Sequence, residues 1–204
     1  MINSPYIRKP ASVQSVMLQV LLALVPGIAA YVWFFGAGIL VQLAIASVAA
    51  LAGEAAMLAI RGKPKALFLT DLSAIVTAWL IALTFPPIAP WWLTVTGTLL
   101  AVVIVKQLYG GLGQNPFNPA MAAFCLMIVA YPALMSQWPA AGQLDFKTQI
   151  ELIFGGARHV DAITGATPLD ALRTALRSAA SPDSELHGLR AAQLMDGPAF
   201  GLLG

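Results

Sequence analysis

The chain has 204 residues, of which 59% are hydrophobic and only 10% are charged, and its mean hydropathy is +0.79. A water-soluble domain would carry roughly a quarter charged residues, so the composition excludes a soluble enzyme. The net charge of +2 comes from basic residues that flank apolar segments, and it does not indicate a nucleic-acid partner.

Charged residues are unevenly distributed along the chain. The first 144 residues contain six basic and two acidic residues, whereas the last 60 contain five basic and seven acidic ones. Three long stretches carry no charge: Ala11 to Gly53, Leu72 to Val105 and Gln107 to Leu144. Each is long enough to cross about 30 Å of hydrocarbon at about 1.5 Å per helical residue. We therefore expect the first part of the chain in lipid and the last part in water.

Five membrane-spanning helices are predicted in the first part. They run over Val13 to Phe35, Gly38 to Ile60, Ala66 to Phe85, Trp91 to Leu108 and Asn118 to Met135. The fold class expected from this pattern is an all-α membrane protein.

The basic residues predict the orientation, because Lys and Arg in short loops stay on the cytoplasmic side. All six basic residues of the first part fall on one side of the five spans: Arg8, Lys9, Arg61, Lys63, Lys65 and Lys106. The connections 36–37 and 86–90 on the other side have none. This places the N-terminus in the cytoplasm, with a transmembrane domain over residues 1–136 and an extracytoplasmic segment over residues 137–204.

Two carboxylates, Glu54 and Asp71, lie near the ends of predicted spans. At mid-bilayer such a group would cost about 2.5 to 3.5 kcal/mol, so both are expected near the cytoplasmic interface. One interpretation is charge compensation by the three basic residues of the 61–65 loop. The other is a path for a cation or proton, for which Asp71 is the better candidate because Ser73 and Thr77 follow it in the same segment.

The connection between the fourth and fifth spans, Lys106 to Met121, is irregular. Three glycines between positions 110 and 113 break the helix, and the pairs Asn115-Pro116 and Asn118-Pro119 each suit a helix N-cap followed by the first helical position. Polar backbone near lipid is tolerated where protein or a water-filled cavity surrounds it. A broken or re-entrant connection beside a small-molecule or ion site is one hypothesis, and a tight turn with two successive caps is the other.

The polar tail contains a complete helix-start pattern from Asp161 to Asp170. Gly165 allows a sharp turn, Thr167 suits the N-cap, and Pro168 suits the first helical position. A capped surface helix explains this pattern without any chemistry. A helix N-terminus also stabilises phosphate through free backbone N–H groups and the helix dipole, so a phosphoester on Thr167 would be electrostatically favourable.

These residues resemble a known family. The segment from Asp161 to Thr167, Asp-Ala-Ile-Thr-Gly-Ala-Thr, matches at every defined position the motif Asp-x-x-(Ser/Thr)-Gly-Ala-Thr, at which a flavin transferase moves FMN from FAD onto the final threonine. The stretches 24–30, 86–92 and 106–121 resemble the RnfD (RsxD) subunit of the Rnf ion-translocating electron-transport complex. The continuation Thr-Pro-Leu-Asp favours this subunit over its relative, the NqrB subunit of the sodium-pumping NADH:quinone reductase.

The resemblance implies a membrane subunit that carries covalent FMN on the outer face of the membrane. The FMN would be bonded through its phosphate to Thr167, and the flavin ring, rather than a catalytic side chain of this chain, would perform the redox chemistry. Asp161, Thr164, Gly165 and Ala166 would be read by the flavin transferase during maturation. No metal site is implied.

The resemblance also implies partners and a location. The subunit would work with other Rnf subunits as a redox-driven ion pump in the bacterial inner membrane, and would not be active alone. Its N-terminus would be cytoplasmic and its FMN segment periplasmic. Members of the family are also associated with a non-covalent riboflavin in the membrane part, for which Gly113 to Pro119 is the candidate stretch here.

The resemblance covers essentially the whole chain but only the first part of a family member. Such proteins are similar to an inverted pair of helical halves, with further spans after the flavin-bearing segment. We therefore expect the chain to be truncated before further transmembrane helices.

Two other functions fit the same pattern. A channel or carrier for a small polar solute would also use a broken helix beside uncharged spans, and the membrane fold of the family looks similar to that of urea transporters. A purely structural protein that anchors partners is the third hypothesis.

Overall fold

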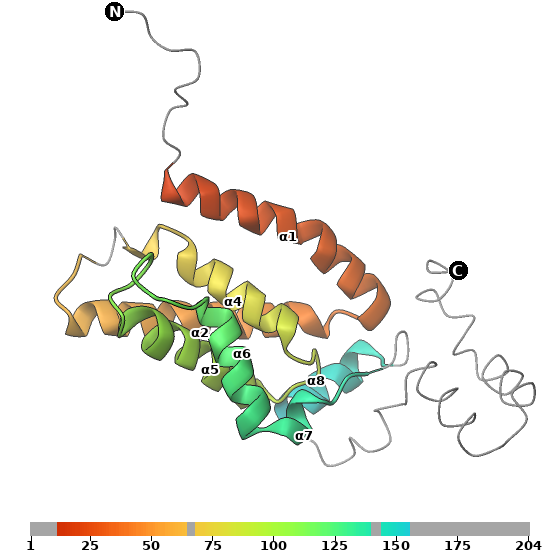
Figure 1. Ribbon diagram of the computed structural model, residues 1–204. Coiled ribbons are helices and arrows are strands. Elements are labelled where there is room, and N and C mark those ends of the chain that lie inside the picture. The colour runs from red at the N-terminus through yellow and green to blue at the C-terminus, as the bar shows by residue number, and fades with distance from the viewer. Residues whose placement is uncertain (1–11, 65–67, 140–143, 156–204) are drawn as a thin grey trace, which may run out of the picture.

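The computed structural model describes residues 12–64, 68–139 and 144–155, and within these ranges every regular element is a helix (Figure 1). The elements are α1 (Val13–Phe35), α2 (Gly38–Ile60), α4 (Ser73–Thr84), α5 (Trp91–Leu99), the π-helix η1 (Leu100–Gln107), α6 (Pro119–Ala130), α7 (Pro132–Met135) and α8 (Phe146–Gly155). The all-helical expectation is confirmed for this part of the chain.

The helices predicted for the first two spans have the predicted bounds. Helices α1 and α2 each have 23 residues and a hydropathy of 2.0, which is long and apolar enough to cross a membrane. The other apolar helices are shorter, over Ser73–Thr84, Trp91–Gln107 and Pro119–Ala130. The total of five crossings therefore stays a prediction.

The third and fifth predicted spans are interrupted for local reasons. Helix α4 begins only at Ser73, because Leu72 adopts a left-handed conformation with φ 63° and the Asp71 carboxylate accepts from the Ser73 backbone N–H. Helix α6 ends at Ala130, because Tyr131 precedes Pro132 and leaves the helical region, at φ −134° and ψ 58°.

Helix α2 lies at the centre of the bundle. It packs against α4 and α5, and α6 packs against α4 and η1 (Figure 1). Small side chains meet between α2 and α4, where Ala46 and Ala50 share one buried cluster with Ala74 and Ala78. Residues without bulky side chains let helix backbones approach closely, which is how helices associate in lipid.

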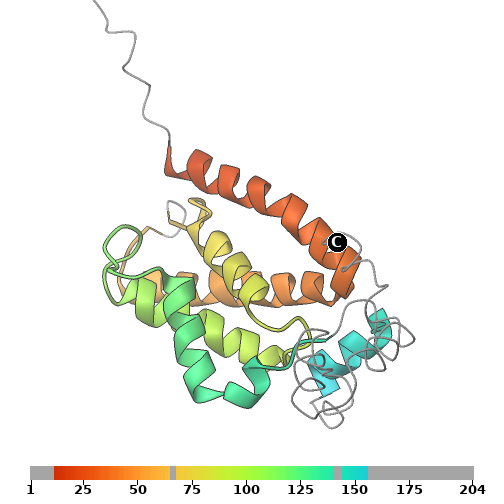
Figure 2. The ribbon, with the colours of Figure 1, turned by 45° about the vertical axis from the view of Figure 1, so that its right-hand side comes forward.

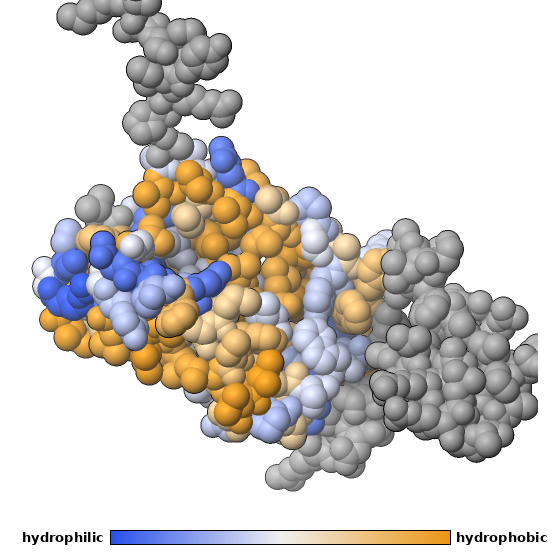
Figure 3. All heavy atoms as spheres, in the orientation of Figure 1, coloured by the Kyte–Doolittle hydropathy of each residue, from blue (hydrophilic) through white to orange (hydrophobic). Residues whose placement is uncertain are grey.

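Helix α1 lies on the outside of this bundle, across α2 and α4 (Figure 2). Its buried residues are Leu21 and Ile28, while large apolar side chains such as Leu22 and Trp33 are exposed. Figure 3 shows apolar side chains covering much of the flanks of the helices. An apolar surface of this extent is incompatible with water and suits lipid or other membrane helices.

The two ends of the bundle differ in character. At one end the Arg61 guanidinium donates to the backbone oxygens of Gln107 and Gly110, which joins the C-terminus of α2 to that of η1. Hydrophilic side chains gather at this end, on the left in Figure 3. At the opposite end α8 contacts the turn between α1 and α2. We call these the Arg61 end and the α8 end.

Candidate functional site

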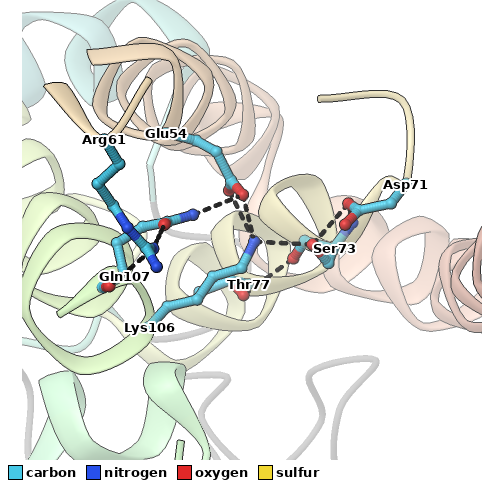
Figure 4. A network of polar contacts seen from close by, with 7 residues as sticks. All are labelled: Glu54, Arg61, Asp71, Ser73, Thr77, Lys106 and Gln107. Atoms are coloured by element: carbon cyan, nitrogen blue, oxygen red, sulfur yellow. Dashed lines mark hydrogen bonds and ion pairs between the residues drawn. The ribbon is translucent and has the colours of Figure 1, made fainter. Parts of the chain in front are cut away.

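Polar side chains gather inside the Arg61 end of the bundle (Figure 4). They come from α2, from α4 and the residues before it, and from η1. We call this group the Glu54–Lys106 network, and its members are Glu54, Arg61, Asp71, Ser73, Thr77, Lys106 and Gln107.

The centre of the network is a buried ion pair. Lys106 Nζ lies 2.8 Å from Glu54 Oε1 and 2.7 Å from Oε2, and the two side chains are 2% and 1% exposed. Lys106 Nζ also donates to Ser73 Oγ at 2.7 Å. The three N–H donors of the ammonium group therefore have three acceptors, which is the condition for keeping such a charge away from water.

Ser73 connects this pair to Asp71. Its hydroxyl accepts from Lys106 and donates to Asp71 Oδ1 at 2.6 Å, while its backbone N–H donates to the same oxygen at 2.8 Å. The hydroxyl of Thr77 in turn donates to the Ser73 carbonyl at 2.9 Å. One serine hydroxyl thus joins the buried lysine to the carboxylate that caps α4.

Gln107 makes the corresponding connection to Arg61. Its amide N–H donates to Glu54 Oε1 at 3.0 Å, and its amide oxygen accepts from Arg61 Nη1 at 2.7 Å. Cationic and anionic side chains therefore alternate along this series of hydrogen bonds. In order, the bonded residues are Arg61, Gln107, Glu54, Lys106, Ser73 and Asp71. Such an alternation stabilises each charge by an opposite neighbour.

Lys106 and Gln107, the last two residues of the π-helix η1, both donate to Glu54. The wider register is visible in the bonds from the N–H of Leu108 to the Val103 carbonyl, at 3.1 Å, and from the N–H of Gly111 to the Lys106 carbonyl, at 3.0 Å. Short π-helical segments are rare and occur frequently at functional sites.

The prediction that the 61–65 loop compensates Glu54 is wrong about the partner. Compensation exists, but Lys106 supplies it, and Arg61 reaches the carboxylate only through Gln107. Glu54 lies seven residues before Arg61, about 10 Å deeper along α2, whereas Lys106 comes from a packed neighbour at the same depth. The position of Lys106 between two long charge-free stretches was the sequence signal for a buried base.

The two carboxylates differ in burial. Asp71, predicted as the better candidate for an ion path, is half-buried, and its carboxylate accepts from the backbone N–H of Ser73, the first residue of α4; the ion path itself stays a prediction. Glu54 is almost fully buried and lies at the centre of the network. Ser73 and Thr77, the two residues predicted to accompany Asp71, are both in the network.

A cavity of about 390 Å³ adjoins the network. Ser73, Thr77 and Lys106 form one wall, and the residues from Asn115 to Pro119 form another. We call it the loop cavity. A second hollow of about 390 Å³ lies on the Asp71 side, and Leu112 lines both. The loop cavity is open to the surface, because Leu112 and Phe117 in its lining are exposed.

For the connection from Lys106 to Met121, the sequence left two predictions open: a broken connection beside a small-molecule or ion site, and a tight turn with two successive helix caps. Asn118 caps α6, because its Oδ1 accepts from the Ala120 N–H at 3.0 Å with Pro119 in the first turn. Asn115 caps no helix and instead donates to the Phe117 carbonyl at 2.6 Å. The expected pair of successive caps is thus half confirmed, and the same stretch lines the loop cavity.

The predicted flavin-attachment residues lie outside the described part of the chain. They are Asp161, Thr164, Gly165, Ala166 and Thr167. The helix closest to them in sequence among the described elements is α8, which ends at Gly155.

The model of the NQR2, RnfD, RnfE family matches residues 1–203. The chain belongs to this family. It is 49% identical, over its whole length, to the D subunit of the ion-translocating oxidoreductase complex of Ectopseudomonas mendocina, of which it covers 56%. It is 45% identical over 86% of its length to the same subunit of Shigella dysenteriae, of which it covers 54%, and 42% identical over 97% of its length to that of Escherichia fergusonii, of which it covers 58%.

The chain thus spans just over half the length of the curated relatives it matches. The resemblance to the RnfD subunit is confirmed. Together with the exposed apolar helices, membership of the NQR2, RnfD, RnfE family indicates a multi-pass membrane protein.

Proposed function

We propose that this chain is the flavin-carrying part of an RnfD subunit in an Rnf-type redox-driven ion pump. The family match over residues 1–203 supports the assignment to an RnfD subunit. The motif from Asp161 to Thr167 supports the attachment of a flavin. The relatives are named as subunits of an ion-translocating oxidoreductase complex. The proposed partners are accordingly the other subunits of such a complex, the lipid membrane and a flavin transferase.

Thr167 has the role of an attachment point in this proposal. Its hydroxyl would hold FMN through the phosphate, at a helix start predicted from the sequence, where backbone N–H groups and the helix dipole would favour negative charge. Asp161, Thr164, Gly165 and Ala166 would be recognised by the transferase. Bound FMN would supply one-electron and two-electron redox chemistry.

For the membrane part we propose that the loop cavity holds a small molecule, for which a non-covalent riboflavin is the family's expectation. The side chains of Thr77, Asn115 and Asn118 border the cavity and offer hydrogen-bonding groups. Its volume of about 390 Å³ suits a ligand of this class. The Glu54–Lys106 network forms part of the wall, so the ligand would contact charged groups that connect α2, α4 and η1.

The orientation belongs to the same proposal. With the Arg61 end in the cytoplasm, the α8 end and the segment that follows it face the periplasm of a bacterial inner membrane. An exported flavin transferase would then reach Thr167. The basic residue Arg61 and the buried Lys106 lie at the end that the positive-inside rule assigns to the cytoplasm.

Mass spectrometry of the full-length protein, made together with a flavin transferase, tests the attachment. The tryptic peptide containing Thr167 should be heavier by one FMN less one water, and the protein should fluoresce after denaturing electrophoresis. Thr167→Ala should lose both signals. Thr174→Ala, seven residues further along, should keep both.

An unmodified Thr167 peptide under these conditions would contradict the proposal. It would favour the alternative of a channel or carrier for a small polar solute, for which the loop cavity is the supporting feature. Flux of an uncharged solute through proteoliposomes, insensitive to redox state, would then be the expected property.

A further inference from the structure

Helix α8 is held at one end of the bundle by a buried side chain. Gln149 is 1% exposed. Its Oε1 accepts from the Gly38 N–H at 2.7 Å, and its Nε2 donates to the Phe35 carbonyl at 3.1 Å. Phe35 is the last residue of α1 and Gly38 is the first of α2, the two helices that are long and apolar enough to cross a membrane. Helix α8 is therefore fixed at the level where these two helices meet.

The turn between α1 and α2 has the shape that this contact requires. A Cβ added at Gly36 would collide with Gln149 Nε2, and one added at Gly38 would collide with Oε1. Gly36 also has φ 89°, which residues with side chains rarely adopt. The two glycines thus leave the space into which the Gln149 amide inserts, and α8 has one defined place against the turn.

The side chains of α8 form distinct stripes along the helix. Successive residues of a helix are turned by about 100°, so residues four apart share a face. The docked stripe contains Gln149 and Ile153, which is fully buried. A polar stripe contains Lys147 and Glu151, whose side chains are 84% and 66% exposed. The contact with the bundle therefore uses only one side of α8.

Between the docked stripe and the polar stripe lies an apolar one. It consists of Phe146, Ile150 and Phe154, and we call it the Phe146–Phe154 stripe. The two phenylalanines are 50% and 55% exposed, and Ile150 is partly buried. Eight residues of helix give the stripe a length of about 12 Å. An apolar stripe of this kind beside a polar one is the pattern of an amphipathic helix with an uncovered apolar face.

Exposed tryptophans surround the same end of the bundle. Trp33 lies in the last turn of α1 and is 79% exposed, and Trp91 begins α5 and is 45% exposed. Trp91 belongs to this end because the connection before it is bonded to α2, where Gln42 donates to the Ala89 carbonyl at 2.6 Å. Tryptophan collects at the boundary between the acyl chains and the headgroups of a bilayer. These side chains indicate that the α8 end lies at such a boundary.

We propose that α8 is an interfacial helix whose Phe146–Phe154 stripe contacts lipid at this boundary. Amphipathic helices of this kind place the apolar face about 5 to 10 Å into the headgroup and acyl boundary. The stripe lies close to apolar surface of the membrane helices, since Leu40 in the first turn of α2 is 48% exposed. Lys147 and Glu151, on the adjoining stripe, stay with water and headgroups.

This assignment changes the expectation for the segment after the predicted spans. The charged residues of that segment predict that it lies in water, yet two phenylalanines and an isoleucine side by side in water would be unfavourable. Contact with lipid removes this apolar surface from water. The proposal is independent of whether Thr167 carries FMN.

Fluorescence quenching tests the proposal in the full-length protein, reconstituted in phosphatidylcholine vesicles with and without the other subunits of its complex. Before reconstitution, bimane is attached to Phe146→Cys or Phe154→Cys in a Cys125→Ser background. Glu151→Cys is the matched control, because it is an exposed position of the polar stripe on the same helix. One quencher is a phospholipid with a nitroxide near the top of its acyl chain, and the other is aqueous iodide.

The lipid nitroxide should quench the labels at positions 146 and 154 severalfold more than the label at position 151, and iodide should show the reverse order. Equal access of iodide to all three labels would place the stripe in water and overturn the proposal. Loss of lipid quenching at positions 146 and 154 when the other subunits are added would show that a protein covers the stripe, which would also overturn it.

A second comparison tests whether the stripe itself holds α8 at the bilayer. Phe146→Ser should lower the lipid quenching of the label at position 154, because the stripe loses one of its two aromatic side chains. Lys147→Ser, an exposed change at the next residue, should leave it unchanged. Equal quenching in the two variants would contradict contact of the stripe with lipid.

Discussion

Lys106 Nζ lies 2.7 Å from Glu54 Oε2, with both side chains at most 2% exposed. Breaking such a pair from one side leaves a buried charge without compensation. We expect Lys106→Met to lower the free energy of unfolding of the detergent-solubilised protein by about 3 to 5 kcal/mol. The double variant Lys106→Met/Glu54→Gln should recover most of this loss, whereas simple addition of the two single effects would contradict the pairing. Lys147→Met, at an exposed pair, should leave stability unchanged.

Ser73→Ala should remove the hydroxyl that connects Lys106 to Asp71 and should lower the thermal stability of the protein. It removes one acceptor of Lys106 Nζ and one donor to Asp71 Oδ1, and a buried group left without a partner costs about 1 to 3 kcal/mol. The matched control is Ser47→Ala, because the Ser47 hydroxyl bonds only to the Leu43 carbonyl of its own helix among the contacts the structure describes. Thermal unfolding of the two variants in the same detergent measures the difference. Equal melting temperatures would show that the Ser73 connection is energetically unimportant.

Gly97→Ala should strain the packing between α5 and the end of α4. A Cβ at Gly97 would press on the Phe85 ring, which is 1% exposed and has no room to move freely. Overpacking of a close-packed core costs about 1 to 3 kcal/mol. Adding Phe85→Leu should restore part of the lost thermal stability, and a further loss in the double variant would argue against this contact as the cause.

Thr77→Phe should fill the loop cavity with an aromatic ring. If the cavity holds the non-covalent flavin, the amount of flavin released by mild denaturation should fall severalfold, while FMN bonded to Thr167 should stay constant. Thr96→Phe is the control, because Thr96 is also a helical threonine whose hydroxyl bonds to a carbonyl one turn earlier, that of Trp92, and it does not line the cavity. Equal loss of released flavin in both variants would contradict the assignment.

The orientation can be read by labelling single cysteines in the Cys125→Ser background. Ser184→Cys should react with a membrane-impermeant maleimide in intact cells, because the segment after the membrane part is expected outside. Gln114→Cys, an exposed position at the Arg61 end, should react only after permeabilisation. The reverse pattern would invert the proposed topology.

The sequence predicted those features that depend on local composition. The bounds of α1 and α2 follow from long charge-free stretches, and the α6 cap at Asn118 follows from the Asn-Pro pair. The late start of α4 was missed, because the left-handed Leu72 and the cap by Asp71 interrupt a stretch that is apolar on both sides.

Features that depend on packing between distant segments were beyond sequence reasoning. The partner of Glu54 lies 52 residues further along, and its burial depends on how α2 meets η1. The π-helical register of η1 has no compositional signal. Gln149 was also missed, although the closely spaced Gly36 and Gly38 indicated that something approaches the turn between α1 and α2.

The ion pair in the bundle has a consequence for how the protein is made. Glu54 leaves the ribosome 52 residues before Lys106, which corresponds to about 3 to 10 s at a synthesis rate of roughly 5 to 20 residues per second. During this interval the nascent second helix carries an acidic group whose later counterion does not yet exist. The charge of Glu54 therefore gains its compensating partner only after the fourth apolar segment has been made.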